Sequence, residues 1–430
     1  MGRRTVAVVG GGCAGVLATR ELLRCTDHRV VMIEPDEPGG GLAYGQARPW
    51  HLLNSRAGAM GADKDGFIGF ARCGPDEFRP RQEYGAYLRE VFATAAREGG
   101  DRLDLVKARA TGVSDHGVAL AGGGVIRADE IVVATGNPAA AQPVAVRDHP
   151  DYIADPWRPG VLDAIPSDVP VLLVGAGLTA VDVALTLTED RHRDAPITAV
   201  SRRGQLPLTH TSVAAPPLEL SGRAGLDGGA ALPERVALRD VVRLVRASAA
   251  RAGDWRAVVD GLRPHLDELW AAFTPDEQDA FLRHLARPWE CHRHRMAPSI
   301  GARVGELLAE GRLEVRAGGI RSIEAPRAGG LLVELDAGVQ WFGAVVNCAG
   351  PGRLPAAAGE FVAGLLRSGR ARVGPHGLGL DIDAGGRLVG ADGRTGNMWL
   401  IGPLRRGARW ETTAVPEIRD QAAAVTIPIR

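Results

Sequence analysis

The sequence predicts an α/β protein that contains two parallel-sheet units of Rossmann type and a mostly helical insertion. Two segments carry this prediction, VAVVGGGCAGVLA at 6–18 and VLLVGAGLTAVDVAL at 171–185, because each passes from an apolar strand through a glycine turn into a helix. The chain has 430 residues, more than one ordinary domain needs, and 45% of them are hydrophobic. It is therefore long and apolar enough to bury more than one core.

The charge balance and the cysteines exclude several classes of protein. The 51 basic and 51 acidic residues cancel, so no overall charge draws the chain to nucleic acid or to a membrane surface. The cysteines are odd in number, scattered and never spaced C-x-x-C, which argues against a disulfide scaffold, a zinc ribbon and a dithiol redox centre. We expect a protein of the reducing cytoplasm. The cysteines are Cys13, Cys25, Cys73, Cys291 and Cys348.

Two apolar stretches resemble targeting or membrane segments. The first follows Arg3 and Arg4, but four glycines interrupt it at positions that suit a nucleotide-binding turn. The second, 169–187, contains Gly175, Gly177 and Asp182 and is also better explained by a turn. We therefore expect no transmembrane segment.

Further elements follow from periodicity and composition. The stretch 35–66 is a loop far longer than a typical connection, and such loops are usually functional. A connector with seven prolines at 138–170 marks a domain boundary. The remaining predicted elements are strand 29–33, helix 81–98, a small β-meander over 103–133, a mostly helical stretch 204–298, strands 313–315, 331–335, 344–347 and 398–401, and a last helix 415–425.

The first glycine turn has the spacing of a dinucleotide-binding fingerprint. Gly10, Gly12 and Gly15 form G-x-G-x-x-G between a strand and a helix, and Glu34 ends the next strand. Glycines allow the tight turn, the approach of a pyrophosphate and close helix–strand packing, while the helix N-terminus offers unpaired N–H groups. Glu34 can accept hydrogen bonds from both ribose hydroxyls. The alternative, an incidental glycine-rich turn, does not explain the acid at this spacing.

The second turn has the same plan but a different end. Gly175, Gly177 and Ala180 repeat the pattern, whereas Ser201, Arg202 and Arg203 stand where a ribose-binding acid would be. A carboxylate would repel a 2′-phosphate, and an arginine binds one bidentately. The sequence therefore favours NADPH over NADH, the alternative being that these arginines are solvated loop charges. Tightly bound FAD at the first turn and transient NADPH at the second is the simplest assignment.

At this point the chain resembles flavoproteins with two dinucleotide-binding domains, related to the flavin-dependent N-hydroxylating monooxygenases. The resemblance implies a FAD-binding domain built from 1–165 and 346–430, around an NADPH-binding domain at 166–345 that contains the insertion at about 205–300. The matching stretches are GLAYG (41–45), HLLN (51–54), ATG (134–136), YIADPW (152–157), GAGLTAVD (175–182), SRRG (201–204), HRHR (292–295), NCAGP (347–351) and WETTAVPEIR (410–419).

The glycine turns and the resemblance together give a set of candidate cofactor-binding residues. A helix that begins just after Thr413 would direct its N–H groups and dipole at the flavin pyrimidine, where negative charge collects on reduction. The full set is Gly10, Gly12, Ala14, Gly15, Glu34, Gly136, Gly175, Gly177, Thr179, Ala180, Ser201, Arg202, Arg203, Gly350, Gly402, Thr412 and Thr413.

The long first loop supplies the candidate catalytic residues Asn54, His51 and Tyr44. A reduced flavin that reacts with oxygen needs neutral hydrogen-bond donors in a site that excludes water, and in similar flavin monooxygenases this region lies beside the isoalloxazine. Asn54 is the leading candidate; the alternative is that it only caps a turn.

The stretch CHRHR at 291–295 invites a metal interpretation, which we reject because no second ligand cluster follows at finger-like spacing. We expect His294 and Arg295 to bind an anionic substrate or a cofactor phosphate; an exposed basic face is the alternative. His210 is a further candidate for contact with either NADPH or the substrate, although a structural histidine is the simpler interpretation.

These observations predict an enzyme, a FAD- and NADPH-dependent oxidoreductase. The leading hypothesis is a monooxygenase that uses molecular oxygen to hydroxylate an amine nitrogen of a small amino-acid-like metabolite. The F-x-G-x-x-x-H signature of ketone-oxygenating enzymes is absent, because Pro143 and Ala145 precede His149 where Phe and Gly belong. Two alternatives stay open: a two-electron flavin oxidoreductase without oxygen insertion, and a non-catalytic flavin-binding regulatory protein.

Overall fold

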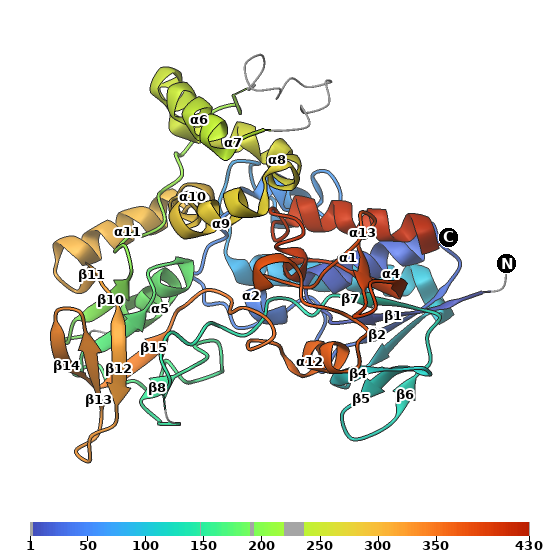
Figure 1. Ribbon diagram of the computed structural model, residues 1–430, viewed down its shortest axis with the longest axis horizontal. Helices are drawn as coiled ribbons and strands as arrows, with labels where there is room; N and C mark the ends of the chain where they lie inside the picture. Colours follow the sequence, from blue (N-terminus) through green and yellow to red (C-terminus); the bar gives the residue numbers. More distant parts are fainter. Residues whose placement is uncertain (1–2, 147, 190–192, 219–235, 430) are drawn as a thin grey trace. The chain divides into compact units, whose positions relative to one another are not determined.

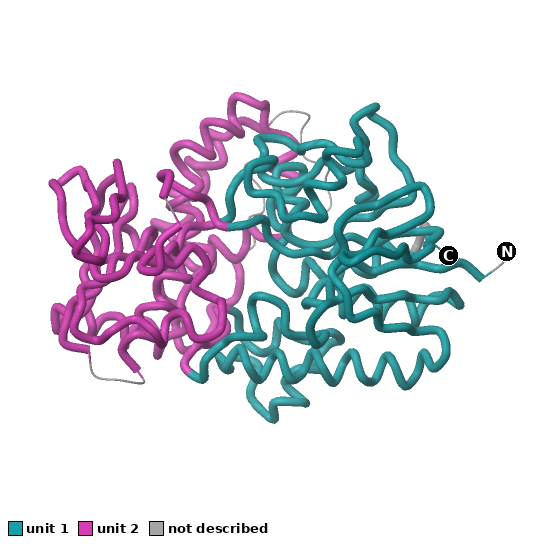
Figure 2. The backbone as a smooth tube through the Cα atoms, turned by 90° about the horizontal axis from the view of Figure 1, so that it is seen from below, with its two compact units in different colours: residues 1–49, 55–139, 351–430 teal, residues 50–54, 140–350 magenta. Residues whose placement is uncertain are grey.

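The computed structural model describes residues 3–146, 148–189, 193–218 and 236–429, so 219–235 of the predicted insertion lie outside the described residues. The chain forms two compact units (Figure 2). Unit 1 comprises Met1–Pro49, Ser55–Ala139 and Pro351–Arg430, and unit 2 comprises Trp50–Asn54 and Ala140–Gly350. The first unit is therefore built from both ends of the chain, and five residues of the long first loop belong to the second.

Unit 1 contains a six-stranded sheet in the order β16-β17-β7-β1-β2-β3. Its strands β7, β1 and β2 are labelled in Figure 1. All neighbours are parallel except β16 and β17. The first strand, TVAVV, is buried along most of its length because its apolar side chains serve both faces of the sheet, as parallel strands require. The strands are β1 (Thr5–Val9), β2 (Arg29–Ile33), β3 (Leu103–Val106), β7 (Glu130–Val133), β16 (Arg387–Val389) and β17 (Thr395–Leu400).

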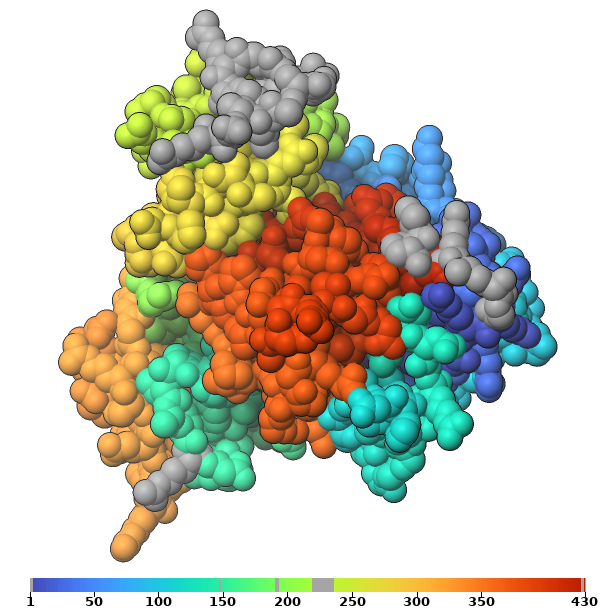
Figure 3. Space-filling view, turned by 45° about the vertical axis from the view of Figure 1, so that its right-hand side comes forward, coloured from blue at the N-terminus to red at the C-terminus, as the bar shows by residue number. Residues whose placement is uncertain are grey.

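Helices α1, α4 and α13 pack together, with α1 in contact with both of the others. The buried face of α1 carries Val16, Leu17, Leu22 and Leu23, which recur at helical spacing. The C-terminal part of unit 1, orange-red to red in Figure 3, lies at the surface, and residues 391–397, a turn and the start of a strand, are exposed. The helices of this unit are α1 (Cys13–Cys25), α2 (Gly41–Tyr44), α3 (Gly66–Ala71), α4 (Arg81–Gly99), α12 (Glu360–Arg367) and α13 (Val415–Ile429).

The prediction of a single meander over 103–133 is wrong. Strand β3 and strand β7 join the large parallel sheet, and only β4 (Ala110–Ser114), β5 (Gly117–Leu120) and β6 (Val125–Ile126) form an antiparallel sheet. Apolar periodicity does not distinguish these two destinations, because a buried parallel strand and a short antiparallel strand look alike over four residues. The small sheet packs on α12 and closes one core of unit 1.

Unit 2 contains a five-stranded parallel sheet in the order β11-β10-β9-β15-β8. Alternate residues of β9 serve two cores: Val171 and Leu173 face α5 and α11, while Leu172 and Val174 face an antiparallel sheet. The strands are β8 (Tyr152–Ile153), β9 (Val171–Val174), β10 (Ile197–Ser201), β11 (Leu313–Ala317) and β15 (Ala344–Asn347), with β12 (Ile320–Glu324), β13 (Leu331–Leu335) and β14 (Gly338–Phe342) in the antiparallel sheet.

The predicted helical insertion is confirmed for the residues that the structure describes. A capping box formed by Thr274 and Glu277 starts α9, and the backbone of Leu208 donates to Cys291 O at 3.0 Å, which ties α10 to the segment after β10. No helix in the described ranges is long and apolar enough to cross a bilayer. The helices of unit 2 are α5 (Leu178–Glu189), α6 (Leu238–Ala252), α7 (Trp255–Leu262), α8 (Leu266–Ala272), α9 (Pro275–His284), α10 (Ala286–Arg293) and α11 (Pro298–Ala309).

Candidate cofactor and substrate sites

The first glycine turn joins β1 to α1 in unit 1. Gly10 has a φ of +105°, and a Cβ there would collide with Ala134 O at the end of β7. A Cβ on Gly15 would collide with the carbonyl oxygen of Gly10. Both positions therefore require glycine, one for its backbone conformation and both for space. The turn leaves the N-terminus of α1 directed at the C-terminal edge of the sheet, where α/β proteins bind their ligands.

Glu34 lies over this turn, as the spacing predicts. Its Oε2 accepts a hydrogen bond from Gly11 N at 2.5 Å, and its Oε1 accepts one from Asp36 N at 3.1 Å. A carboxylate offers about four acceptor positions, so two remain for ribose hydroxyls. The two backbone bonds fix the carboxylate before any ligand arrives.

The residues of unit 1 around this turn fit a bound dinucleotide. The hydroxyls of Thr135 and Thr412 are buried, yet within the described ranges neither has a hydrogen-bond partner. Gly136 has a φ of +78° and open space where a Cβ would project, and a Cβ on Gly402 would lie 3.6 Å from that of Ala14. Buried hydroxyls without partners are costly, so a polar ligand that supplies them is expected here. Thr413, by contrast, is exposed.

Tyr44 lies beside the first turn in a cluster of aromatic and sulfur groups. Its ring meets Tyr84 edge to face at 4.8 Å, and Tyr84 OH is 3.8 Å from Cys13 Sγ. Burial raises the pKa of both phenols, and it raises the pKa of the Cys13 thiol to about 12. All three groups are therefore neutral at physiological pH, so Tyr44 can donate a hydrogen bond but cannot serve as a base.

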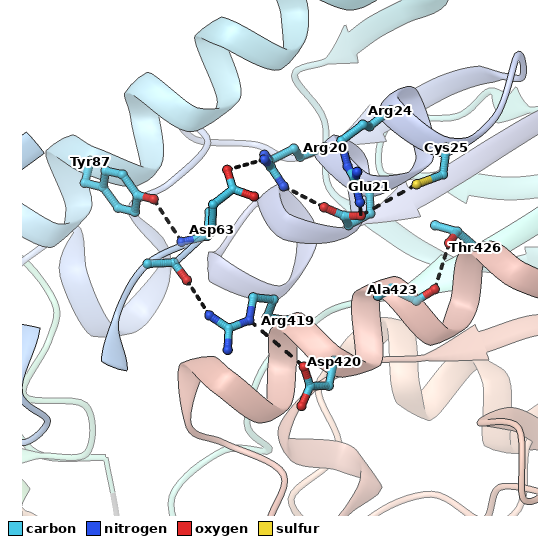
Figure 4. Close-up of polar contacts among 12 residues, drawn as sticks. Arg20, Glu21, Arg24, Cys25, Asp63, Tyr87, Arg419, Asp420, Ala423 and Thr426 are labelled. Carbon is cyan, nitrogen blue, oxygen red and sulfur yellow. Dashed lines mark hydrogen bonds and ion pairs between the residues drawn. The ribbon is translucent and has the colours of Figure 1, made fainter. Parts of the chain in front are cut away.

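The long loop is fastened to unit 1 at 61–63 (Figure 4). Tyr87 OH accepts from Ala62 N at 2.8 Å, Arg419 donates to Gly61 O at 3.1 Å, and Arg20 pairs with Asp63. These contacts come from α4, α13 and α1, and nothing in the loop's sequence indicated them. These contacts hold residues 61–63 in a fixed position on unit 1.

The second glycine turn, in unit 2, repeats the geometry of the first. Gly175 has a φ of +117°, and a Cβ there would lie 2.7 Å from Cys348 O at the end of β15. Ala180 is only 2% exposed and packs in the core on α5, one residue after Thr179. The buried Ser201 hydroxyl has no partner among the residues that the structure describes. Gly350, at the other end of this loop region, has open space where a Cβ would project.

The two arginines after β10 differ in their surroundings. Arg203 donates from Nη2 to His284 O at 2.9 Å, so its side chain is attached to the end of α9. Arg202 is exposed and makes no polar contact with any described residue. It is therefore the arginine that can turn toward a phosphate without giving up an existing hydrogen bond.

The structure brings two of the three candidate catalytic residues into unit 2, together with His210. His51 is 2% exposed, and its Nε2 lies 3.1 Å from Asp182 O and 2.9 Å from Thr186 Oγ1 on α5. His210 Nε2 donates to Asn54 O at 3.2 Å. These bonds anchor Trp50–Asn54 from both sides, whereas Tyr44 belongs to unit 1.

The basic stretch at the end of α10 is paired with acids. His294 Nε2 lies 3.1 Å from Glu290 Oε2, and the buried Arg295 pairs with Asp260. Burial lowers the pKa of Arg295, and two of its nitrogens, Nε and Nη1, have no partner within the described part of the chain. Cys291 and its neighbours also line an apolar pocket of ≈ 390 Å³. This stretch therefore does not form an exposed basic face.

Sequence reasoning missed Arg287. This residue of α10 donates from Nη2 to Ala176 O, inside the second glycine turn, at 2.8 Å. No motif contains it, because it comes from the helical insertion 111 positions further along the chain. The contact becomes visible only in the folded structure, where α10 packs against the second glycine turn.

Comparison with known proteins supports the assignment of the first turn. Residues 7–138 match a protein family described as FAD-NAD(P)-binding. The predicted resemblance to FAD/NAD(P)-binding flavoproteins is confirmed. No curated protein matches the chain.

Solved structures with this fold include N-hydroxylating enzymes. The chain is similar to the cadaverine monooxygenase of desferrioxamine biosynthesis from Erwinia amylovora, with 12% identity, a TM-score of 0.68 and coverage of 100% of this chain and 95% of that one. It is similar to the ornithine N-hydroxylase of Kutzneria sp. 744, with 14% identity, a TM-score of 0.64 and coverage of 100% and 99%. A thioredoxin reductase from Lactococcus lactis also aligns, with 13% identity, a TM-score of 0.52 and coverage of 99% and 97%. The predicted fold is thereby confirmed.

Proposed function

We propose that this chain is a FAD- and NADPH-dependent monooxygenase that hydroxylates an amine nitrogen of a small amino-acid-like metabolite. The observation that carries the proposal is the pair of glycine turns of opposite electrostatic character, one under the carboxylate of Glu34 and one followed by the exposed Arg202. A carboxylate suits an unphosphorylated ribose and an arginine suits a 2′-phosphate. The fold shared with the ornithine and cadaverine enzymes supports the reaction class.

Each unit has residues for one cofactor. In unit 1, Glu34 would hold the ribose of FAD, and the buried hydroxyls of Thr135 and Thr412 would find partners on the cofactor. In unit 2, the second glycine turn and Arg202 would hold NADPH. Bound NADPH would supply a hydride, and bound FAD would provide the flavin chemistry that carries its two electrons to oxygen. The overall reaction is R–NH2 + O2 + NADPH + H⁺ → R–NHOH + H2O + NADP⁺.

The candidate catalytic residues take different roles in this proposal. Asn54 is assigned to donate a hydrogen bond at the reacting centre; its side-chain amide makes no polar contact with any described residue and is available for that bond. His51 is a positioning residue, because a buried ring nitrogen bound to the backbone of a helix holds its segment in place. Tyr44 contributes a neutral hydroxyl. His294 and Arg295 are assigned to an anionic group of the substrate.

The experiment is a coupled assay of the purified, FAD-loaded protein. NADPH oxidation, oxygen consumption, hydrogen peroxide and hydroxylamine product are followed with ornithine, lysine and cadaverine, the amines of the similar enzymes. The proposal predicts one hydroxylamine per NADPH with at least one primary amine. NADPH oxidation that requires another electron acceptor and proceeds without oxygen would replace it with the two-electron alternative, which the thioredoxin reductase fold also permits. Absence of NADPH oxidation under every condition would favour the regulatory alternative.

A further inference from the structure

Arg287 reaches the second glycine turn from the helical insertion. It lies on α10 and is partly buried, and its Nη2 donates both to Ala176 O, at 2.8 Å, and to Gln205 O. Ala176 is the middle residue of the G-A-G turn. The guanidinium is therefore held at a fixed position by the backbone of the turn on one side and by the segment that follows SRRG on the other.

The charge of Arg287 has no counterion in the described part of the chain. Both of its contacts there are neutral carbonyl oxygens, and no aspartate or glutamate pairs with it. Carbonyl groups orient a guanidinium but leave its full positive charge, and its Nε and Nη1 donors make no hydrogen bond within the described ranges. A fixed cation with unused donors is the arrangement that binds an anion.

The unused donors lie at the open face of the turn. Nη1 is 3.9 Å from the point where a Cβ on Gly177 would project, and it is the nearest described atom to that point. Gly177 is the position at which the backbone of a dinucleotide fingerprint approaches the pyrophosphate, next to the N-terminus of α5 (Leu178–Glu189). The space in front of Gly177 is thus bordered by a guanidinium and by unpaired backbone N–H groups.

We propose that Arg287 binds the pyrophosphate of the nicotinamide dinucleotide. The proposal rests on the proposed function, because it requires the second turn to be the nicotinamide site. Two arginines then divide the recognition of the cofactor: Arg202 binds the 2′-phosphate and determines which dinucleotide is preferred, whereas Arg287 binds the group that NADPH and NADH share. The helical insertion, which carries Arg287, is then part of the cofactor site.

The test compares three ligands that separate these two contacts. Dissociation constants of NADP⁺, NAD⁺ and adenosine 2′-monophosphate are measured by calorimetry on the FAD-loaded protein. The Arg287→Gln variant keeps a donor for Ala176 O but removes the charge. It should weaken NADP⁺ and NAD⁺ by the same factor, about tenfold to a hundredfold, and leave adenosine 2′-monophosphate, which has no pyrophosphate, unchanged.

The matched variant is Arg202→Ala, which should weaken NADP⁺ and adenosine 2′-monophosphate and spare NAD⁺. Arg287→Lys keeps the charge and should retain more NADP⁺ affinity than Arg287→Gln. If Arg287→Gln weakens all three ligands equally, the side chain only shapes the turn, and if it weakens none, it has no part in binding; either result overturns the inference. Failure of the unmodified protein to bind any of the three ligands would instead overturn the proposed function, and this inference with it.

Discussion

The two glycine turns of this protein have the same backbone but opposite neighbours. In unit 1 the middle residue, Gly11, donates its N–H to the carboxylate of Glu34. In unit 2 the middle residue, Ala176, offers its carbonyl oxygen to the guanidinium of Arg287. In the proposed function, the strand, the turn and the helix form a site for a dinucleotide, and the side chain that borders the turn determines the charge that the ligand meets. A glycine turn therefore indicates that a dinucleotide binds, whereas the neighbouring side chains indicate which dinucleotide it is.

The largest expected effect is the loss of FAD and of stability on substitution of the third small residue of the first turn, Gly15, compared with Ala180 in the second turn. A Cβ on Gly15 would overlap Gly10 O, whereas the equivalent Ala180 already carries a Cβ in a packed core. Gly15→Ala should abolish FAD binding and lower the free energy of unfolding by about 3 kcal/mol. The reciprocal Ala180→Gly should cost only about 1 kcal/mol and leave the flavin in place. Flavin absorbance and urea unfolding of both variants measure this; retention of FAD by Gly15→Ala would mean that the turns are not comparable.

The next effect concerns the charge at the second turn. Arg202→Ala should raise the Michaelis constant for NADPH about tenfold to a hundredfold and leave that for NADH almost unchanged, because only NADPH carries the 2′-phosphate. Arg203→Ala is the matched control, since Arg203 is already bonded to His284 O. Steady-state kinetics with both cofactors measure the two variants. A larger loss of NADPH selectivity in Arg203→Ala would reverse the assignment of the two arginines.

A smaller effect tests Asn54, which lies in the part of the long first loop that belongs to unit 2. Asn54→Ala should keep near-normal reduction by NADPH but release hydrogen peroxide, with about a tenfold loss of hydroxylated product per NADPH, because a neutral donor at the reacting centre is gone. Lys64→Ala, exposed in the same loop, is the control and should remain coupled. Full coupling in Asn54→Ala with the true substrate would make Asn54 a turn residue.

The smallest effect lies in the pH dependence of stability. Burial raises the pKa of Cys13 from 9.0 to about 12, while the equivalent position of the second turn, Leu178, cannot ionise. The folded state keeps the proton that the unfolded state loses, so this contribution is complete below pH 9 and disappears as the pH rises through 12. Cys13→Ala should lose less stability than the unmodified protein between pH 8 and 10.5, by at most about 2 kcal/mol. If both proteins lose the same free energy of unfolding between the two pH values, the Cys13 thiol is not buried in this way.

Local patterns predicted the two strand–turn–helix elements to which we assign the cofactors, since the spacing from Gly10 to Glu34 and the arginines after the second strand are properties of short stretches. Arg287 could not be predicted in this way, because its partner Ala176 is 111 residues distant and the helix that carries it has no motif. The destination of Trp50–Asn54 was equally hidden, since the burial of His51 against α5 depends on two segments that only the folded chain brings together. The meander failed for a related reason, as strand pairing is decided by neighbours from elsewhere in the chain.

The membership of Trp50–Asn54 in unit 2 has a consequence for the order in which the protein is completed during synthesis. The indole of Trp50 donates to Thr186, 136 residues later in the chain. At the usual pace of a ribosome, this partner emerges on the order of ten seconds after Trp50 does. The N-terminal strands and helices can begin to fold in that interval, but this short stretch must wait. Unit 2 is therefore completed by a segment that is synthesised long before the rest of the unit. In the nascent chain, Trp50 and His51 lack their partners on α5 until that helix has been synthesised.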